Sequence, residues 1–223
     1  MSKTGIEELF LRFVGPLIES PPKIMRYTFL RGIFRIKGET DCKTIYLTFD
    51  DGPIPESTPW LLDTLDRYGI KATFFMVGDN VRKYPELYDE VVRRGHSVGN
   101  HTMHHLDGSL VWTTRYVRDV EEASRYVKSN LLRPPHGWMR FLQREYLSKK
   151  YKIVMYDVVT RDYSKYVDAE KVVGNVRKYS RPGAIIVFHD SLKSIGKLRT
   201  ALPRSIEWLL NEGYIFKTVP END

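Results

Sequence analysis

Cysteine is almost absent from this sequence of 223 residues, in which Cys42 is the single example. One thiol excludes an intramolecular disulfide and any zinc module built from several cysteines. Long apolar runs are absent too, because no stretch approaches the roughly 18 residues that a membrane-spanning helix needs. The fold must therefore be stabilised by an ordinary buried core, for which a chain of 223 residues is long enough.

A secretory signal is also not recognisable. Glu7, Glu8 and Arg12 interrupt the apolar residues near the N-terminus, and no small-residue cleavage site follows. We therefore predict a cytoplasmic protein without a transmembrane span. The alternatives are that residues 9–18 contact a membrane surface or a partner, or that the chain is exported by an unrecognised route.

Nucleic-acid-binding motifs are lacking as well. The formal net charge is +7, but lysines and arginines are interleaved with acids along the chain and form no basic stripe. We interpret this charge as a solvated surface and predict no nucleic-acid partner. The sequence does not predict an oligomeric state.

What the sequence does contain is a regular alternation of strand and helix patterns. Short apolar runs alternate with segments of helical periodicity. The predicted strands are residues 43–49, 72–77, 96–99, 131–132, 152–159, 183–188 and 214–219, and the predicted helices are 59–69, 84–94, 114–129, 143–149, 169–179 and 198–210. This alternation predicts an α/β fold in one domain, a distorted (β/α) barrel of about seven parallel strands. Residues 1–40 lack clear periodicity, and we predict an N-terminal arm that packs on the domain of residues 41–223.

Polar side chains follow most of these strands. Asp50 and Asp51 end the first strand, and two adjacent carboxylates there require a cation or a proton to offset their repulsion. In a barrel the carboxyl ends of the strands meet at one end, where catalytic residues collect. The polar residues that follow the later strands are His101, His104, His105, Arg133, His136, Asp162, Tyr163, His189 and Asp190.

His101 and His105 stand four residues apart. On a helical turn this spacing places both imidazoles on one face, within reach of one metal ion. Two imidazoles and one carboxylate form a common catalytic zinc set that leaves a coordination position free. One of the paired aspartates would then bind the metal, and the other would be free to move a proton. We interpret His96 as a packing residue and His104 as an exposed one.

Five ordered motifs resemble those of the polysaccharide deacetylase family, also called the NodB-homology family or carbohydrate esterase family 4. TFDDGP (residues 48–53) is similar to the first motif, HTMHH (101–105) to the second, RPPHG (133–137) to the third, and VFHD (187–190) to the fifth. The fourth motif is degenerate. Family members often carry Asp-any-any-Asp-Trp at this place, whereas VTRDY (159–163) keeps only the second Asp, as Asp162, and has Tyr163 in place of Trp. The resemblance covers about residues 43–217 in order and spacing.

The resemblance implies a role for each matching residue. Asp51, His101 and His105 would hold the metal, which we expect to be zinc, with cobalt or nickel as alternatives. Asp50 would be the catalytic base that deprotonates the attacking water, and His189 would protonate the leaving amine. Arg133 would hold Asp50, and Asp162 would orient His189. A backbone amide near His136 would stabilise the oxyanion. Tyr163 and Val187 would line the pocket for the acetyl methyl group.

The implied function is metal-dependent removal of N-acetyl groups from an N-acetylated glycan of the chitin-oligosaccharide or peptidoglycan type. Alternatives are an O-acetyl esterase or cyclic-amide hydrolase on the same metal site, and an inactive glycan-binding homologue. A phosphotransferase with Asp50 as nucleophile would need a second Asp at position 52, which is glycine. The degenerate fourth motif leaves either Asp157 or Asp162 to orient His189.

Overall fold

The computed structural model describes residues 19–22, 32–36 and 43–221. The predicted membrane or partner contact of residues 9–18 lies outside the described residues, and so does Cys42. Within the described part, no helix has the length and apolar character needed to cross a membrane. The division of the chain into an arm and a catalytic domain stays a prediction.

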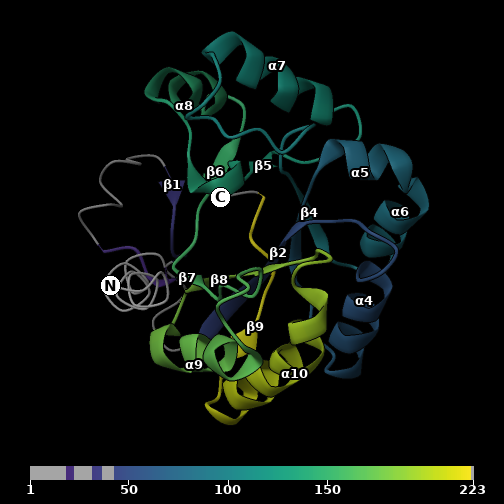
Figure 1. The fold of residues 1–223 in the computed structure, drawn as a ribbon, viewed down its shortest axis with the longest axis vertical. Helices are drawn as coiled ribbons and strands as arrows, with labels where there is room; N and C mark the ends of the chain where they lie inside the picture. Colours follow the sequence, from purple (N-terminus) through teal and green to yellow (C-terminus); the bar gives the residue numbers. More distant parts are fainter. Residues whose placement is uncertain (1–18, 23–31, 37–42, 222–223) are drawn as a thin grey trace, which may run out of the picture.

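The centre of the molecule is a curved sheet whose strands all pair in parallel (Figure 1). In the described residues it has nine strands in the order β1-β6-β5-β4-β3-β2-β8-β7, with β9 paired to β2. The strands are β1 Gly32–Ile33, β2 Thr44–Asp51, β3 Thr73–Met76, β4 Ser97–Asn100, β5 Leu131–Leu132, β6 Lys152–Val154, β7 Val158–Val159, β8 Ile185–His189 and β9 Ile215–Phe216. The predicted distorted barrel of parallel strands is confirmed.

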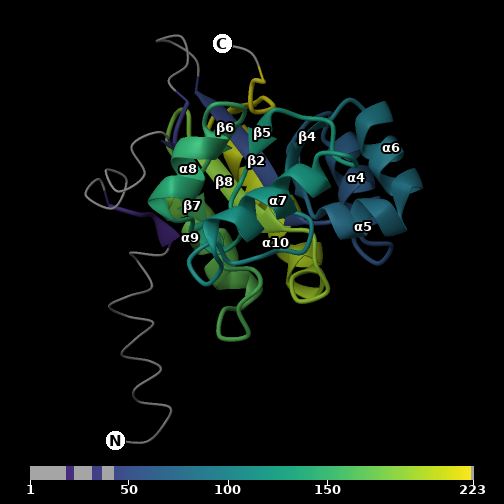
Figure 2. The ribbon, with the colours of Figure 1, turned by 90° about the horizontal axis from the view of Figure 1, so that it is seen from above.

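The helices lie around the outside of this sheet, with α7 beside α8 and α9 beside α10 (Figures 1 and 2). Their bounds are α4 Thr58–Arg67, α5 Gly78–Lys83, α6 Pro85–Arg93, α7 Thr113–Ala123, α8 Phe141–Leu147, α9 Ala169–Tyr179 and α10 Ile195–Asn211, and a 3₁₀ turn η1 spans Pro135–Gly137. The sequence did not predict α5 as a separate helix, and α7 ends at Ala123 instead of residue 129.

The core explains why β2 and β8 read as continuous apolar runs. Helices cover the outer face of the sheet, and side chains on its inner face pack against one another across the curve, so these central strands are buried on both faces. Phe49 of β2 stacks on Phe74 of β3 and on Phe188 of β8, with ring centroids 5.1 and 5.8 Å apart. All three rings are essentially inaccessible to solvent. Burying each such ring contributes about 1.5–3 kcal/mol, which fixes the relative position of the three strands.

One predicted strand is wrong in its extent. The run 152–159 contains two strands, β6 and β7, which lie in different parts of the sheet. The chain changes neighbours between them: the Met155 amide donates to the Ile33 carbonyl at 2.9 Å, whereas the Asp157 amide donates to the Ile185 carbonyl at 2.9 Å. Apolar periodicity records burial and not which strand is the neighbour, so the break at Tyr156 left no signal in the sequence.

Residues 32–36 occupy the seam that the curvature leaves between β6 and β8. β1 pairs with β6, and Arg35 forms an antiparallel bridge to Ala184 just before β8. The Ile36 amide then donates to the Gly183 carbonyl at 2.9 Å. Gly183 has a φ of +80°, and a Cβ there would lie 2.0 Å from the Ile36 carbonyl oxygen, so the close approach requires glycine.

The register of the strands brings the polar residues to one end of the sheet. Asp50 lies opposite Phe75 of β3 and opposite His189 of β8, and Asn100 lies opposite Met76 and Leu132. The residues that follow Asn100 and Leu132 are His101 and Arg133, and their amides donate to Met76 and Asn100 at 2.9 and 3.0 Å. Four strand ends therefore present their side chains to one cleft.

Candidate metal centre and active site

Three residues at this end of the sheet place ligand atoms around one point. Asp51, His101 and His105 each offer one atom, and these atoms lie within 4.8 Å of one another. The Asp51 Oδ1 atom is 3.2 Å from Nε2 of His105 and 3.8 Å from Nε2 of His101. Two imidazoles and a carboxylate that converge in this way have the composition of a catalytic zinc site.

His101 has its coordinating nitrogen fixed by a hydrogen bond on the other side of the ring. Its Nδ1 donates to the Arg133 carbonyl at 2.8 Å, which leaves Nε2 without a proton and directed toward Asp51. Burial lowers the pKa of His101 to about 4, so the ring is neutral at neutral pH. A neutral imidazole with a free lone pair is the form that binds a metal, and the residues present fit a divalent cation.

The Asp51 carboxylate is ionised under all ordinary conditions. Burial alone would raise its pKa, but the hydrogen bond with His105 and the nearby rings of His189 and His101 outweigh burial and lower the pKa below the usual range. Asp51 also has a φ of +83°, which strains a non-glycine backbone. This conformation turns the side chain away from the path of β2 and toward the histidine pair.

The predicted helical turn between His101 and His105 is wrong. Residues 101–107 form an irregular loop in which Thr102 and His105 have φ values of +65° and +53°. The loop is held by Asp119 of α7, whose Oδ2 accepts from the Met103 and His104 amides at 2.8 and 3.0 Å. The two imidazoles therefore converge because the loop is anchored to a neighbouring helix and not because of helical spacing.

Asp50 lies beside the metal ligands and is paired with Arg133. The Arg133 Nη1 atom donates to Asp50 Oδ1 at 2.6 Å and to Thr48 Oγ1 at 2.7 Å, while Nη2 donates to the Met155 carbonyl at 2.9 Å. The guanidinium is 1% exposed and lies 4.0 Å from the centroid of the Phe75 ring. A fixed cation at this position keeps Asp50 in one orientation next to Asp51.

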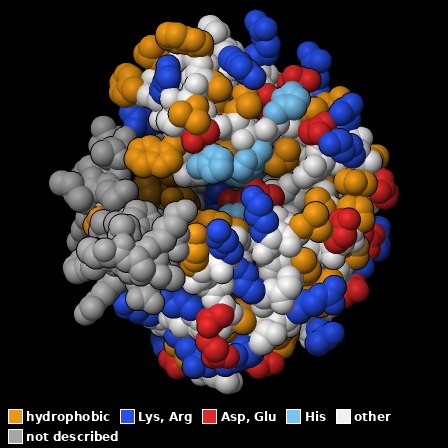
Figure 3. Space-filling view, viewed as in Figure 1, with side chains coloured by type: hydrophobic (Ala, Val, Ile, Leu, Met, Phe, Trp, Pro, Cys, Tyr) orange, Lys and Arg blue, Asp and Glu red, His pale blue; other side chains and the backbone are white. Residues whose placement is uncertain are grey.

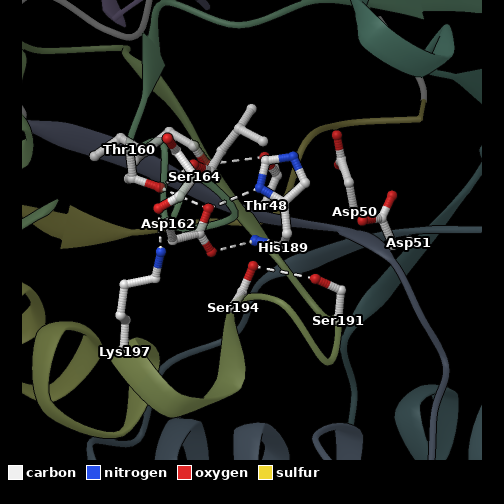
Figure 4. A network of polar contacts seen from close by, with 12 residues as sticks. Thr48, Asp50, Asp51, Thr160, Asp162, Ser164, His189, Ser191, Ser194 and Lys197 are labelled. Atoms are coloured by element: carbon white, nitrogen blue, oxygen red, sulfur yellow. Dashed lines mark hydrogen bonds and ion pairs between the residues drawn. The ribbon is translucent and has the colours of Figure 1, made fainter. Parts of the chain in front are cut away.

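His189 lies between these two aspartates and a third carboxylate, Asp162 (Figure 4). Its Nδ1 donates to Asp162 Oδ1 at 2.8 Å, and its backbone amide donates to Oδ2 at 2.8 Å. Burial opposes the charged ring, but Asp162, with smaller contributions from Asp51 and Asp50, outweighs burial and raises the pKa of His189 to about 9. The imidazole is therefore a cation at neutral pH.

The contacts show which of the two candidate carboxylates lies against His189. Asp157, the alternative that the sequence left open, is buried and paired with Arg181, whose Nε donates to Asp157 Oδ2 at 2.6 Å. Asp162 is fully buried, and its Oδ1 also accepts from the Thr160 hydroxyl at 3.2 Å. Asp162 is thus the residue in contact with His189.

One cleft with a volume of about 500 Å³ is lined by Asp50, Asp51, His101, His105, Arg133 and His189. Histidines and carboxylates meet at a hollow in the surface (Figure 3). The predicted residues His136, Tyr163 and Val187 line the cleft as well. The Tyr163 ring packs edge-on against His189 with centroids 4.6 Å apart, and the His136 ring lies 4.8 Å from that of His105. The cleft is also lined by residues to which the sequence analysis gave no role: Pro21, Pro134, Gly137, Trp138, Tyr156, Val159 and Lys193.

Tyr156 is the most informative of the missed residues. It lies in the break between β6 and β7, and a Cβ on Gly137 would be 2.7 Å from its hydroxyl oxygen. Burial raises its pKa to about 12, so the hydroxyl keeps its proton and is a hydrogen-bond donor in the cleft. No sequence signal could have found it, because the surrounding apolar run reads as one continuous strand.

The comparison with known proteins decides the family. The sequence profile described as polysaccharide deacetylase matches residues 37–154 of this chain. The chain belongs to the polysaccharide deacetylase family.

Relatives and solved structures agree with this assignment. A "peptidoglycan-N-acetylglucosamine deacetylase" of Bacillus cereus is 35% identical over 191 residues, which cover 80% of this chain and 87% of the relative. A "chitooligosaccharide deacetylase" of Sinorhizobium fredii is 34% identical over 202 residues, which cover 82% of this chain and 93% of the relative. A crystal structure of a peptidoglycan N-acetylglucosamine deacetylase superposes with a TM-score of 0.75 at 31% identity, covering 84% of this chain and 90% of the other.

This deacetylase is therefore a hydrolytic enzyme of carbohydrate esterase family 4, and the predicted family, fold and reaction class are confirmed. The family and the Asp-His-His triad together indicate a divalent metal ion. The roles of the individual site residues stay predictions, and the geometry above shows which of them the fold brings together.

Two further residues of the deacetylase motifs shape the turn after Asp51. Asp190, the last residue of the fifth motif, accepts hydrogen bonds from the Ser57 and Thr58 hydroxyls at the start of α4, at 2.6 Å in the case of Thr58. A Cβ on Gly52 would lie 2.2 Å from Asp190 Oδ2, so glycine is required there. Burial raises the pKa of Asp190 to about 7. Asp190 thus anchors the first motif to α4.

The remaining histidines have structural roles. His96 is 6% exposed, and its Nδ1 accepts from the Ala72 amide at 3.2 Å. Burial lowers the pKa of His96 to about 4, as expected for the predicted packing residue. His104 is half exposed as predicted, and its Nδ1 donates to Asp119 Oδ1 at 2.6 Å, which strengthens the anchor of the metal-binding loop.

A short N-terminal segment forms one wall of the cleft. Pro21 lines the cleft, and Glu19 beside it is 1% exposed. The Glu19 carboxylate lies 3.5 Å from Arg161 and 3.7 Å from Lys171, and it accepts from the Tyr179 hydroxyl at 3.3 Å. Arg161 precedes Asp162 in the fourth motif, so this N-terminal segment contacts the loop that carries the partner of His189.

Proposed function

We propose that this enzyme removes N-acetyl groups from an N-acetylated glycan with zinc as its metal. One observation carries the proposal: a buried aspartate paired with arginine and a cationic histidine paired with aspartate both face the Asp-His-His triad. Amide hydrolysis needs a base to activate water and an acid to protonate the departing nitrogen. Asp50 and His189 both line the cleft beside the candidate metal ligands, and in this proposal they are the base and the acid.

The ligand set favours zinc, and cobalt or nickel would also be accepted by two imidazoles and a carboxylate. When bound, such a cation lowers the pKa of water and polarises a carbonyl oxygen. The chain's own contribution is to keep Asp51 ionised, His101 neutral and both histidine Nε2 atoms directed to one point.

Asp50 is placed to accept a proton from the attacking water. Its Oδ1 is held by Arg133, which leaves the other carboxylate oxygen for the reaction. Because Arg133 is buried and makes four hydrogen bonds, the position of Asp50 is set before substrate arrives. Preorganisation of this kind removes the need to reorient the base during the reaction.

His189 is placed to deliver a proton to the leaving nitrogen. The ring donates to Asp162 through Nδ1, so Nε2 carries the proton that is available for transfer. The raised pKa of about 9 keeps that proton on the ring at neutral pH. We propose that Tyr163 and Val187 bound the acetyl methyl group and that a backbone amide near His136 donates to the oxyanion.

The substrate class is proposed from the relatives, two of which are named for peptidoglycan N-acetylglucosamine and for chitooligosaccharide. An N-acetylated amino sugar is the chemistry common to both. The cytoplasmic location predicted from the sequence stays a prediction, which cell fractionation with an antibody to the protein would check.

The test is acetate release from matched N-acetylated and O-acetylated glycans, with metal content measured on the same preparation. We expect release from N-acetylglucosamine oligomers, loss of release after chelation, and recovery with zinc. If acetate were released faster from O-acetylated xylan than from the N-acetylated oligomers, or only from aryl acetates, the enzyme would be an esterase and not an N-deacetylase. A protein that binds the oligomers and metal without releasing acetate would be an inactive homologue.

A further inference from the structure

Exposed apolar side chains collect on one surface of the molecule. Of the twelve large apolar side chains most exposed in the described residues, six lie between positions 110 and 146. We call this set the α8 surface, and it consists of Leu110, Trp112, Trp138, Phe141, Leu142 and Tyr146. Leu110 and Trp112 are 79% and 77% exposed. Single exposed leucines are ordinary, whereas exposed leucines and aromatic rings concentrated on one helix and the loop packed against it are typical of an interaction site.

The backbone beneath this surface is rigidly connected. Arg140 at the start of α8 donates from Nη2 to the Ser109 carbonyl at 3.0 Å. The buried Gln143 donates to the Gly108 and Val111 carbonyls at 2.9 and 3.2 Å. A Cβ on Gly108 would lie 2.8 Å from the Trp138 carbonyl oxygen, so the loop before α7 is pressed against α8. The loop and the helix that carry the exposed rings are therefore fixed relative to each other.

Cations surround the apolar side chains, as Figure 3 shows over the α7 and α8 side of the molecule. On loop 107–112, α7, Arg140, α8 and the turn after α8, five cations are exposed: Arg115, Arg118, Arg140, Lys149 and Lys150. Glu121 is the one fully exposed carboxylate of these segments, and Asp107, Glu122 and Glu145 are half-buried. The guanidinium of Arg140 lies 5.5 Å from the Trp112 ring centroid, and that of Arg144 lies 5.0 Å from the Phe141 centroid. The partner of this surface must accept apolar groups and carry negative charge.

Sugar rings are a poor match to the part of this surface that lies outside the cleft. Glycans stack on free flat aromatic faces, whereas guanidinium groups lie over the rings of Trp112 and Phe141. Leu110 and Leu142, among the most exposed members, offer no ring at all. Leucine, tryptophan and tyrosine flanked by arginine and lysine is the composition that enters the interface of a bilayer with anionic headgroups.

We propose that the α8 surface docks this enzyme on a membrane leaflet that contains anionic phospholipid. Trp138 belongs both to this surface and to the lining of the cleft, so docking holds the cleft beside the headgroup region. The contact is peripheral, and it does not involve residues 9–18, for which a membrane contact was considered from the sequence alone. It is independent of the proposed reaction, because binding to vesicles is measured without substrate.

The test is co-sedimentation of the full chain with phosphatidylcholine vesicles that contain or lack phosphatidylglycerol. Three double variants complete the set. Leu110→Ser with Leu142→Ser removes the apolar contact, and Lys149→Glu with Lys150→Glu reverses the charge. Val92→Ser with Leu210→Ser is the matched control, since these exposed apolar residues lie on α6 and next to the end of α10. None of the six positions lines the cleft.

We expect binding to the anionic vesicles only, and weaker binding as salt is raised. The leucine pair should lower the partition coefficient at least about tenfold, and the control pair should not change it. Unchanged melting temperature and unchanged hydrolysis of an aryl acetate would show that each variant is folded.

Three results would overturn the proposal. The first is absence of wild-type binding to anionic vesicles, and the second is an equal loss in the control pair. The third is a leucine-pair variant that keeps vesicle binding but loses affinity for N-acetylglucosamine oligomers or loses a concentration-dependent dimer. That outcome would show that the α8 surface binds a glycan or a second copy of the chain, and not a membrane.

Discussion

The two sides of the cleft are built in opposite ways. On the metal side, Asp51 and His105 are each about 30% exposed, although His101 is buried. Asp51, Thr102 and His105 have positive φ values, so two of the three ligands are open to solvent on strained backbone. On the acid side, Asp162 is fully buried, and it receives both the ring and the backbone amide of His189. An open coordination position requires exposure, whereas holding a proton on an imidazole requires a buried carboxylate as its partner.

The largest effect should follow from removing a ligand on the open side. His101→Ala and His105→Ala should each lose bound metal and lower kcat/KM at least about 10³-fold, because the stabilisation of developing charge by the cation is worth several kcal/mol. Metal analysis by mass spectrometry after dialysis checks this directly. Full metal occupancy in both variants would show that the ligands are elsewhere. His104→Ala, which removes a support of the same loop but no ligand, separates loss of a ligand from loosening of the loop.

The two adjacent aspartates should separate metal binding from proton transfer. Asp50→Asn should keep the metal and lower kcat by about 10²–10⁴-fold, because a general base is lost. Asp51→Asn should weaken the metal itself, since a neutral amide is a poorer ligand. Equal metal affinity and equal residual rates in the two variants would contradict this division between neighbours on β2.

His189→Ala tests the buried side of the comparison. An amine leaves only with a proton, whereas an aryl oxide leaves without one, so an N-acetyl oligosaccharide should lose about 10²–10⁴-fold in kcat/KM and an aryl acetate much less. The same assays on Asp50→Asn provide the contrast, because a lost base should slow both substrates. An equal loss on both substrates in His189→Ala would reassign this residue to binding or structure.

Asp162→Asn should have a smaller effect that is visible mainly in the pH profile. The pKa of His189 is raised to about 9, so the ring acts as an acid below that pH and loses this ability as pH rises through it. Removing the carboxylate that contributes most to this increase should move the alkaline limb of kcat/KM for the amide substrate to lower pH. Asp157→Asn is the matched control, because Asp157 pairs with Arg181. A similar shift of the alkaline limb in this variant would show that the contact between Asp162 and His189 does not set the pH profile.

The smallest effect should come from the wall formed by the N-terminal segment. Glu19→Gln removes the charge that pairs with Arg161 and Lys171, and loosening Pro21 should raise KM for a long oligosaccharide a few-fold. Hydrolysis of an aryl acetate, which does not reach this wall, should not change. A loss of kcat on both substrates would mean that Glu19 supports the acid side and not the substrate.

The sequence predicted the metal side better than its surroundings. Asp50, Asp51, His101 and His105 are found from strand ends and short spacing, since parallel strands must bring such residues to one edge. Their local geometry was not predictable, because the loop that carries the histidines is set by a distant side chain, Asp119 of α7. A pattern of spacing alone suggests a helical turn, and the tertiary contact overrides it.

The fold shows the same limit. Each strand predicted from an apolar run is present in the structure, because a buried strand requires apolar residues. The apolar runs did not reveal that the run 152–159 changes neighbours, and hence they concealed Tyr156 in the cleft. The short strand β1 was not expected either, since two residues carry no periodicity. Information about which strand lies next to which is distributed over the whole chain and is not contained in any one segment.

The segment 32–36, which fills the seam of the sheet, has a consequence for how the chain assembles. β1 pairs with residues about 120 positions further along the chain, and Arg35 bridges a residue about 150 positions away. Contacts at such separations form slowly, because a long loop must close before they contribute. During synthesis from the ribosome, β1 emerges before every other described strand, yet it has no partner until β6 and the start of β8 have been made. The strand that is synthesised first is therefore among the last to be placed.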